Sequence, residues 1–361
     1  MSEQSKYFSS FDVFAFTICS TIGIGMVFLP FVGGEEIRSA WLFMLFVSLP
    51  FFLLLYLMSQ FAKRYENPNL ILQLKENIYP VLFWPIVIYF MISTIFGGIV
   101  ILRGLLVMTQ VFLLPNSPQW VILGYFLSIA AIGVLYGIKT ITRFVVVFVA
   151  IEFFVFFVLI FFGFRENFRI IYVLPVQPNE LIVLVKSSIS DLARFAGLVT
   201  LLSFIPYVKN KDKLLFPMNL GLGFVVLFYV VLSLIVIGTF GFEEALNLLS
   251  PLIAVVQTFS TGQGVFERFD LFFLSFWLAA FLKLTMILIW FSSFIIKESI
   301  PNISKPFTIF IVVFLMGLGA LLIPNYDYQV WGMHHRNAAF YSLILPIFLL
   351  SYLLIKKRKD S

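Results

Sequence analysis

The sequence predicts an all-α, polytopic membrane protein with ten transmembrane helices, and three observations support that fold class. First, 61% of the 361 residues are hydrophobic and only 12% are charged, whereas soluble domains carry about a quarter charged residues. Second, the chain contains ten apolar stretches, each near the roughly 20 helical residues that cross a bilayer. Third, Lys and Arg concentrate in alternate loops, so the net charge of +6 reflects membrane topology and not nucleic-acid binding.

The apolar stretches form one transmembrane domain, residues 1–361, in two sets of five. They span residues 11–33, 39–61, 82–114, 119–138, 141–163, 181–208, 216–240, 267–297, 307–324 and 338–355. The first set covers about residues 11–163 and the second about residues 181–355, as expected for two repeats. No small-residue cleavage site follows the first stretch, which indicates a retained helix and no signal peptide.

The basic residues predict the orientation in the membrane. One set of loops, together with both termini, holds fifteen of them: Lys6, Lys63, Arg64, Lys75, Lys139, Arg143, Lys209, Lys211, Lys213, Lys297, Lys305, Lys356, Lys357, Arg358 and Lys359. The opposite loops hold four: Arg38, Arg165, Arg169 and Arg336. Because cytoplasmic loops carry the excess of Lys and Arg, we expect both termini in the cytoplasm.

The first stretch contains a sequence typical of an interrupted helix. Residues 20–26 read Ser-Thr-Ile-Gly-Ile-Gly-Met. Gly23 and Gly25 are poor helix formers, and peptide groups freed at membrane depth must be satisfied by protein or by a polar cavity. Transporters with broken helices direct such peptide groups at a bound ligand. We therefore expect Thr21, Gly23, Gly25 and Met26 to bind a ligand; the alternative is that the glycines only permit close helix packing.

The third stretch carries small residues and one charge. Thr94, Gly97 and Gly98 form a stripe that indicates a central helix approached closely by others, and we assign these three residues to the ligand site. Arg103 lies well inside the same stretch. An arginine at this depth is either functional or reaches outward to the interface, and the sequence leaves both interpretations open.

Glu152 lies in the middle of the fifth stretch, too deep to reach an interface easily. A carboxyl group in such surroundings is either neutral or paired with a cation. We therefore treat it as a candidate coupling charge.

The sixth stretch contains a second candidate interruption. Residues 186–197 bring three charged residues and Gly197 to membrane depth. We interpret them as a second broken helix, with Phe195 and Gly197 at the ligand site and Asp191 as a coupling charge; the alternative is a continuous helix with Asp191 and Arg194 paired at i,i+3.

The two candidate interruptions lie five stretches apart. This placement predicts two inverted repeats of five helices, with helices 1 and 6 broken. The prediction depends on placement, because the two halves show no residue-level similarity.

The eighth stretch carries a recognisable motif. It begins with Arg268, Phe269 and Asp270, continues to Trp277 in mid-helix, and reaches Lys283 six residues later. This pattern resembles the spore germination permeases of the B-subunit (GerAB-type) family, which belong to the amino acid–polyamine–organocation superfamily. The resemblance extends over the chain in length, ten-span layout and the glycine-rich sequence before Leu29 and Pro30.

The resemblance implies a LeuT-like fold and a nutrient-sensing role. Members of that family act with separate A and C subunits as germinant receptors in the spore inner membrane. We therefore expect a small nutrient, an amino acid, to bind at the bilayer midplane; the alternative is a proton-coupled amino-acid symporter. Many members carry a glutamate two positions after the glycine of the sixth stretch, where this chain has Val199, so any role of that glutamate in binding amines or protons does not carry over.

The residues give little support to catalysis or metal binding. The chain has a single cysteine, Cys19, and its two histidines are the adjacent His334 and His335, which cannot both face one ion comfortably. No metalloprotease or serine–base motif is present. We expect no enzymatic activity, no metal and no cofactor.

Lys283 lies near the middle of the eighth stretch, where an ammonium group must find acceptors or lose its proton. LeuT-like folds place this helix against the interruption in the first. We predict that Lys283 contacts the carbonyl groups of residues 20–23 and acts as a tethered substitute for a sodium ion. The alternative is a structural ion pair with Glu152 or Asp191.

Overall fold

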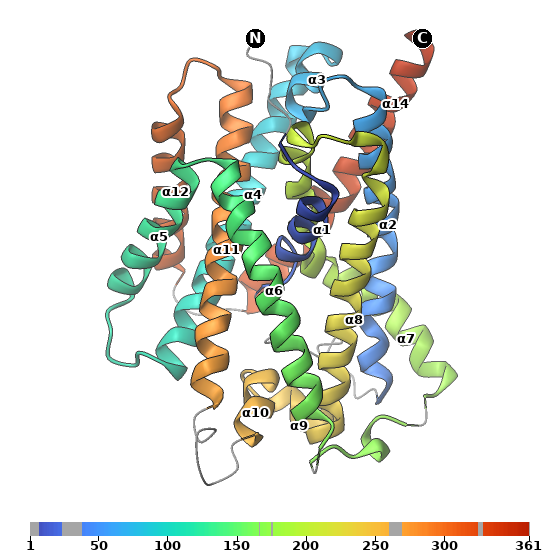
Figure 1. Cartoon of the computed structure of the whole chain (residues 1–361), viewed down its shortest axis with the longest axis vertical. Coiled ribbons are helices and arrows are strands. Elements are labelled where there is room, and N and C mark those ends of the chain that lie inside the picture. Colours follow the sequence, from blue (N-terminus) through green and yellow to red (C-terminus); the bar gives the residue numbers. More distant parts are fainter. Residues whose placement is uncertain are drawn as a thin grey trace.

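The computed structural model describes residues 7–23, 38–165, 167–174, 176–259, 269–323 and 328–360. Within these ranges the chain forms a bundle of long helices (Figure 1). The extended pairing in the described residues is an isolated parallel bridge between Phe8 and Val208. The prediction of an all-α fold is thus confirmed for the described part of the chain.

The elements follow one another along the chain as short connections and long apolar helices. The first half contains α1 (Ser10–Cys19), η2 (Arg38–Leu42), α2 (Phe43–Arg64), α3 (Leu70–Asn77), α4 (Pro80–Phe112), α5 (Gln119–Leu135) and α6 (Ile138–Gly163). The second half contains η3 (Ile170–Tyr172), α7 (Pro178–Ser188), η4 (Ile189–Ser203), η5 (Ile205–Tyr207), η6 (Lys211–Lys213), α8 (Leu215–Phe240), α9 (Phe242–Asn247), α10 (Pro251–Thr258), α11 (Phe269–Ser299), α12 (Lys305–Leu322), α13 (Tyr328–Ala339), η7 (Phe340–Ile344) and α14 (Leu345–Asp360).

Among the described residues, seven helices are long and apolar enough to cross a membrane. They correspond to seven of the ten predicted stretches. The other three match α1 and the residues after it, the shorter apolar helix α5, and the combination of α7 with η4. A polytopic membrane protein is therefore confirmed, while the count of ten spans stays a prediction.

Local sequence explains where several of these helices begin. Ser9 caps α1, because its hydroxyl accepts the Asp12 backbone N–H while the Asp12 carboxylate accepts the Ser9 backbone N–H. The acid near the start of the first apolar stretch is thus a capping residue. Gly137 and Gly241 adopt φ values of 93° and 77° at the starts of α6 and α9, a left-handed region that other residues avoid.

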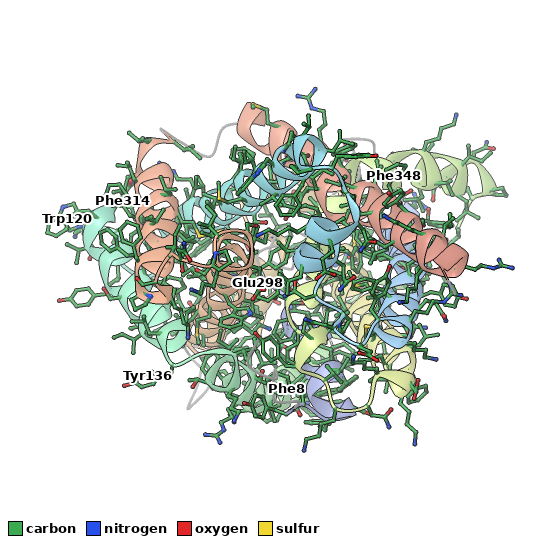
Figure 2. The ribbon with its side chains drawn as sticks, turned by 90° about the horizontal axis from the view of Figure 1, so that it is seen from above. Phe8, Trp120, Tyr136, Glu298, Phe314 and Phe348 are labelled. Carbon is green, nitrogen blue, oxygen red and sulfur yellow. The ribbon has the colours of Figure 1, made fainter. Side chains whose placement is uncertain are left out.

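Aromatic and aliphatic side chains cover the outer surface of the bundle. Viewed along the bundle, Trp120, Tyr136 and Phe314 lie at its edge (Figure 2), and their exposed fractions are 68%, 76% and 55%. An apolar outer surface suits lipid and would be costly in water. The start of α1 and the end of α14 lie toward the same end of the bundle (Figure 1), as an even number of spans requires.

Candidate functional site

The candidate site is centred on the C-terminal end of α1. This helix ends at Cys19, and the Ser20 and Thr21 hydroxyls donate to the carbonyl of Thr17 at 3.1 and 2.9 Å. The Thr17 carbonyl, near the end of the helix, thus accepts from side chains of the two residues that follow it. The structure describes this segment as far as Gly23; Gly25 and Met26, like Leu29 and Pro30, lie outside the described residues.

Gly197 of η4 packs directly against this helix end. A Cβ atom placed on Gly197 would overlap the carbonyl oxygen of Ser20 and come within 3.5 Å of the Thr21 backbone nitrogen. Only a residue without a side chain permits this approach of two backbones. The structure therefore brings together Gly197 and the end of α1, which the sequence assigned to one site.

Tyr229 of α8 fixes the same helix end from another side. Its hydroxyl donates to the Thr21 carbonyl at 3.1 Å, and the whole residue is buried. It also lies close enough to Gly23, Asp191 and Arg194 to interact with them. Sequence reasoning missed this residue, because one tyrosine in an apolar helix carries no positional signal.

Gly23 is covered on its other side by α11. A Cβ atom on Gly23 would lie 2.5 Å from a methyl group of Leu284. The end of α1 is therefore enclosed by η4, α8 and α11, three elements that are distant from it in sequence.

The sixth predicted helix changes conformation beside this point. The α-helical α7 gives way to the 3₁₀ conformation of η4 at Ile189, and Asp191 has the non-helical angles φ −115° and ψ 21° within a kink. Asp191 also pairs with Arg194 three residues later. A kink and an i,i+3 ion pair thus occur together, so the pairing named in the alternative is present, while a fully broken helix stays a prediction.

Phe195 contributes an apolar wall near the kink. Its ring lies 5.4 Å from that of Phe51 in α2 and 5.9 Å from that of Tyr229. Val199, one turn farther along η4, is buried among hydrophobic residues. The structure therefore places Phe195 against Tyr229, which binds the Thr21 carbonyl at the end of α1.

The predicted residues of α4 face other neighbours. The Thr94 hydroxyl donates to the carbonyl of Phe90 in its own helix at 2.8 Å. A Cβ atom on Gly98 would lie 2.7 Å from Met316 of α12, and one on Gly97 would lie 3.5 Å from the Tyr341 hydroxyl. Close helix packing therefore accounts for both glycines, and their part in a ligand site stays a prediction.

A polar cluster near Gly97 was not predicted. The side-chain oxygen of Asn337 accepts hydrogen bonds from the Tyr89 hydroxyl at 2.7 Å and the Ser93 hydroxyl at 3.2 Å. His334 is buried nearby, with its ring edge-on to Phe96. Among the described residues, no group of three or more His, Cys, Asp or Glu could hold a metal ion.

A second ion pair lies beside the last residue of α1. The ammonium group of Lys283 in α11 pairs with the carboxylate of Glu152 in α6, and both side chains are completely buried. The thiol of Cys19, the last residue of α1, lies 3.4 Å from the other Glu152 oxygen. One cluster therefore joins α1, α6 and α11.

This geometry corrects the prediction made for Lys283. Its ammonium group donates to the Glu152 carboxylate instead of a carbonyl group of residues 20–23. The contact found is the ion pair with Glu152 that the alternative named, and the role of this pair stays a prediction. The carboxylate, and not the end of α1, offsets the lysine charge, because it lies across from Lys283 in the fold.

Arg103 belongs to a separate polar network. Its guanidinium group donates to the Gln119 side-chain oxygen at 2.9 Å and contacts the Ala320 carbonyl at 3.5 Å. Gln119 in turn donates to Gln110 at 2.9 Å. Arg103 thus connects the start of α5 with α12, and Gln119 joins it to the end of α4.

Comparison with solved structures identifies the class of fold. A nucleobase-cation-symport-1 family transporter, Mhp1, solved in a closed conformation with bromovinylhydantoin bound, superposes with a TM-score of 0.64. The match covers 99% of this chain and 80% of that transporter, at 14% sequence identity. The chain therefore has the fold of a LeuT-type transporter.

Sequence comparison then gives the family. A family model described as spore germination protein matches residues 7–327, and the chain belongs to this family. It is 27% identical over 261 residues to spore germination protein B2 of Bacillus subtilis (strain 168), covering 72% of this chain and 70% of that protein. It is 24% identical over 346 residues to spore germination protein A2 of the same organism, covering 94% and 93%.

Proposed function

We propose that the protein is a nutrient-receptor subunit that binds an amino acid where α1 ends against η4. The observation that supports this most directly is the contact between two backbones, at Ser20 and Gly197, inside a membrane protein. Backbone groups at such a point are available to a small polar ligand, whereas those within a regular helix are bonded to one another. Family membership supports the germination role.

The residues around the contact suit a ligand that carries one positive and one negative charge. The C-terminal end of α1 presents carbonyl groups, which attract an ammonium group. The Asp191–Arg194 pair lies on the facing segment, within reach of Tyr229. Thr21, Gly23, Phe195 and Gly197 would line the site, and Gly25 and Met26 would complete it from the continuing chain. The α-carboxylate and the α-amino group of an amino acid provide matching charges.

In this proposal, binding shifts a conformational equilibrium that partner subunits read. A ligand can do so only by binding one conformation more tightly than the other. The A and C subunits of a germinant receptor are the proposed partners, in the spore inner membrane with both termini of this chain in the cytoplasm. No catalytic step is required.

A proton-coupled symporter is the alternative function, and the buried Lys283–Glu152 pair favours it. This pair occupies a position where charge can couple the movements of α1, α6 and α11. We propose that Lys283 and Glu152 together, and not the lysine alone, act as the coupling charges. Neither role requires sodium.

Purified protein in detergent and in proteoliposomes would separate the two functions. Each of the twenty radiolabelled amino acids is tested for equilibrium binding and for uptake, with and without sodium and with an imposed proton gradient. Saturable binding without uptake supports the receptor, whereas uptake driven by the proton gradient supports the symporter. If none of the twenty amino acids binds saturably, the proposed ligand class is refuted.

The orientation has its own test. Cys19→Ala removes the single cysteine, and Ser117→Cys or Asn210→Cys is then probed in intact cells with a membrane-impermeant thiol reagent. We expect Ser117→Cys to react from outside and Asn210→Cys to react only after permeabilisation. The reverse pattern would place both termini outside.

A further inference from the structure

The segment before α1 is bound to the end of the sixth predicted helix. The backbone N–H groups of Tyr7 and Phe8 donate to the Tyr207 carbonyl at 2.8 and 3.2 Å, and the Lys209 N–H donates to the Phe8 carbonyl at 3.0 Å. These bonds form the isolated parallel bridge between Phe8 and Val208. Residues 7–8 thus pair through their backbone with a segment about 200 positions later.

Side chains reinforce the bridge. The ring of Phe8 stacks on Phe204 with centroids 4.5 Å apart, and Phe204 stacks on Phe16 of α1 at 4.4 Å. All three residues are buried. Such pairs stabilise a contact beyond the burial of their area, so the three rings join the terminal segment, the end of η4 and α1.

Two further helices are attached at the same place. The ammonium group of Lys139, at the start of α6, lies 3.5 Å from the centre of the Tyr7 ring, a cation–π contact. The Tyr207 ring lies 6.4 Å from that of Trp290 in α11. The terminal segment therefore contacts α6 and the residues that follow η4, and it is linked to α1 through Phe204 and to α11 through Tyr207.

We propose that Tyr7 and Phe8 form a latch that holds the site closed toward the end of the bundle that carries both termini. The latch lies on the segment that enters α1 directly, and α1 ends at the site. The latch must detach before α1 and η4 can separate at the end of the bundle that carries both termini. This proposal goes beyond ligand binding, because it assigns a gate to residues that lie outside the candidate site.

A thiol reporter tests the latch without any ligand. Ser20→Cys is introduced in the Cys19→Ala background, because Ser20 is buried at the contact with Gly197. The purified protein in detergent is treated with a charged methanethiosulfonate reagent, and the rate of modification is measured by mass spectrometry. We expect Phe8→Ala to accelerate modification about tenfold, which corresponds to about 1.4 kcal/mol in the opening equilibrium.

Phe11→Ala is the matched control. Phe11 lies three residues after Phe8, it is 54% exposed, and its ring neighbours Phe14 and not the stack of Phe8, Phe204 and Phe16. We expect this control to react at the rate of the parent. Equal rates for Phe8→Ala and the parent, or equal acceleration by both alanine variants, would overturn the proposal.

A second pair of variants keeps the test decisive if Phe8→Ala does not fold. Lys139→Gln removes the cation from the Tyr7 ring, while Arg143→Gln changes a neighbouring exposed cation of α6. We expect about twofold faster modification for Lys139→Gln, as a weak cation–π contact implies, and no change for Arg143→Gln. Identical rates for these two variants would also contradict the latch.

Discussion

Two buried ion pairs in the described part of the chain each join a carboxylate to a basic side chain, but they connect groups at very different separations along the sequence. Asp191 and Arg194 lie three residues apart in one segment, and their side chains are 3% and 7% exposed. Glu152 and Lys283 lie 131 residues apart, and neither side chain is exposed. The first pair therefore stabilises a local kink, whereas the second connects two helices and lies against a third.

The difference determines what each pair can do when the protein changes shape. A local pair moves with its own segment, so it can survive a rearrangement of helices. A pair between helices must stretch or break when those helices separate, and a charge left alone in a low-dielectric interior is costly. We therefore expect the Glu152–Lys283 pair, and not the Asp191–Arg194 pair, to couple helix movement to charge.

The largest expected effect is that of Lys283→Met. This change leaves the Glu152 carboxylate buried without its cation, which costs about 3–5 kcal/mol. Thermal unfolding in detergent should show a strongly lowered Tm. The double variant Lys283→Met with Glu152→Gln should recover part of the loss, because both charges are then absent; an unchanged Tm for Lys283→Met would show that the pair contributes nothing.

Gly197→Ala should have the next largest effect. The added methyl group overlaps the Ser20 carbonyl, and such overpacking costs about 1–3 kcal/mol. The response to ligand should fall more than stability does, because the variant displaces the end of α1. Gly223→Ala is the control, since a Cβ atom there meets nothing within 4 Å; the same loss in both variants would argue against a special contact.

Asp191→Asn should destabilise the protein less than Lys283→Met does. The asparagine still offers an oxygen to Arg194, so we expect a loss of about 1–2 kcal/mol. Chemical unfolding of the two variants side by side measures the difference. A larger loss for Asp191→Asn would reverse the comparison and make the local pair the dominant one.

Tyr229→Phe should have the smallest effect on stability. It removes the hydroxyl that donates to the Thr21 carbonyl, a hydrogen bond worth about 0.5–1.5 kcal/mol. Tyr125→Phe, on a residue that is 74% exposed, controls for the loss of a hydroxyl as such. Ligand affinity of Tyr229→Phe that equals that of Tyr125→Phe would exclude Tyr229 from the site.

The sequence by itself determined the class of the protein and the features that depend on neighbouring residues. Apolar stretches of sufficient length predict a polytopic membrane protein, and the family motif predicted the fold that the structural comparison supports. The Asp191–Arg194 pair was also foreseeable, because residues three positions apart share one face of a helix.

Only the tertiary structure decided which distant groups meet. The sequence placed Glu152 and Lys283 at membrane depth but left Glu152 either neutral or paired and offered several partners for Lys283, and the packing of α6 against α11 selected one pairing. It gave no reason to single out Tyr229, which acquires its role through the Thr21 carbonyl. Such contacts depend on how helices pack, and the spacing of residues along the chain carries no information about a partner more than a hundred positions away.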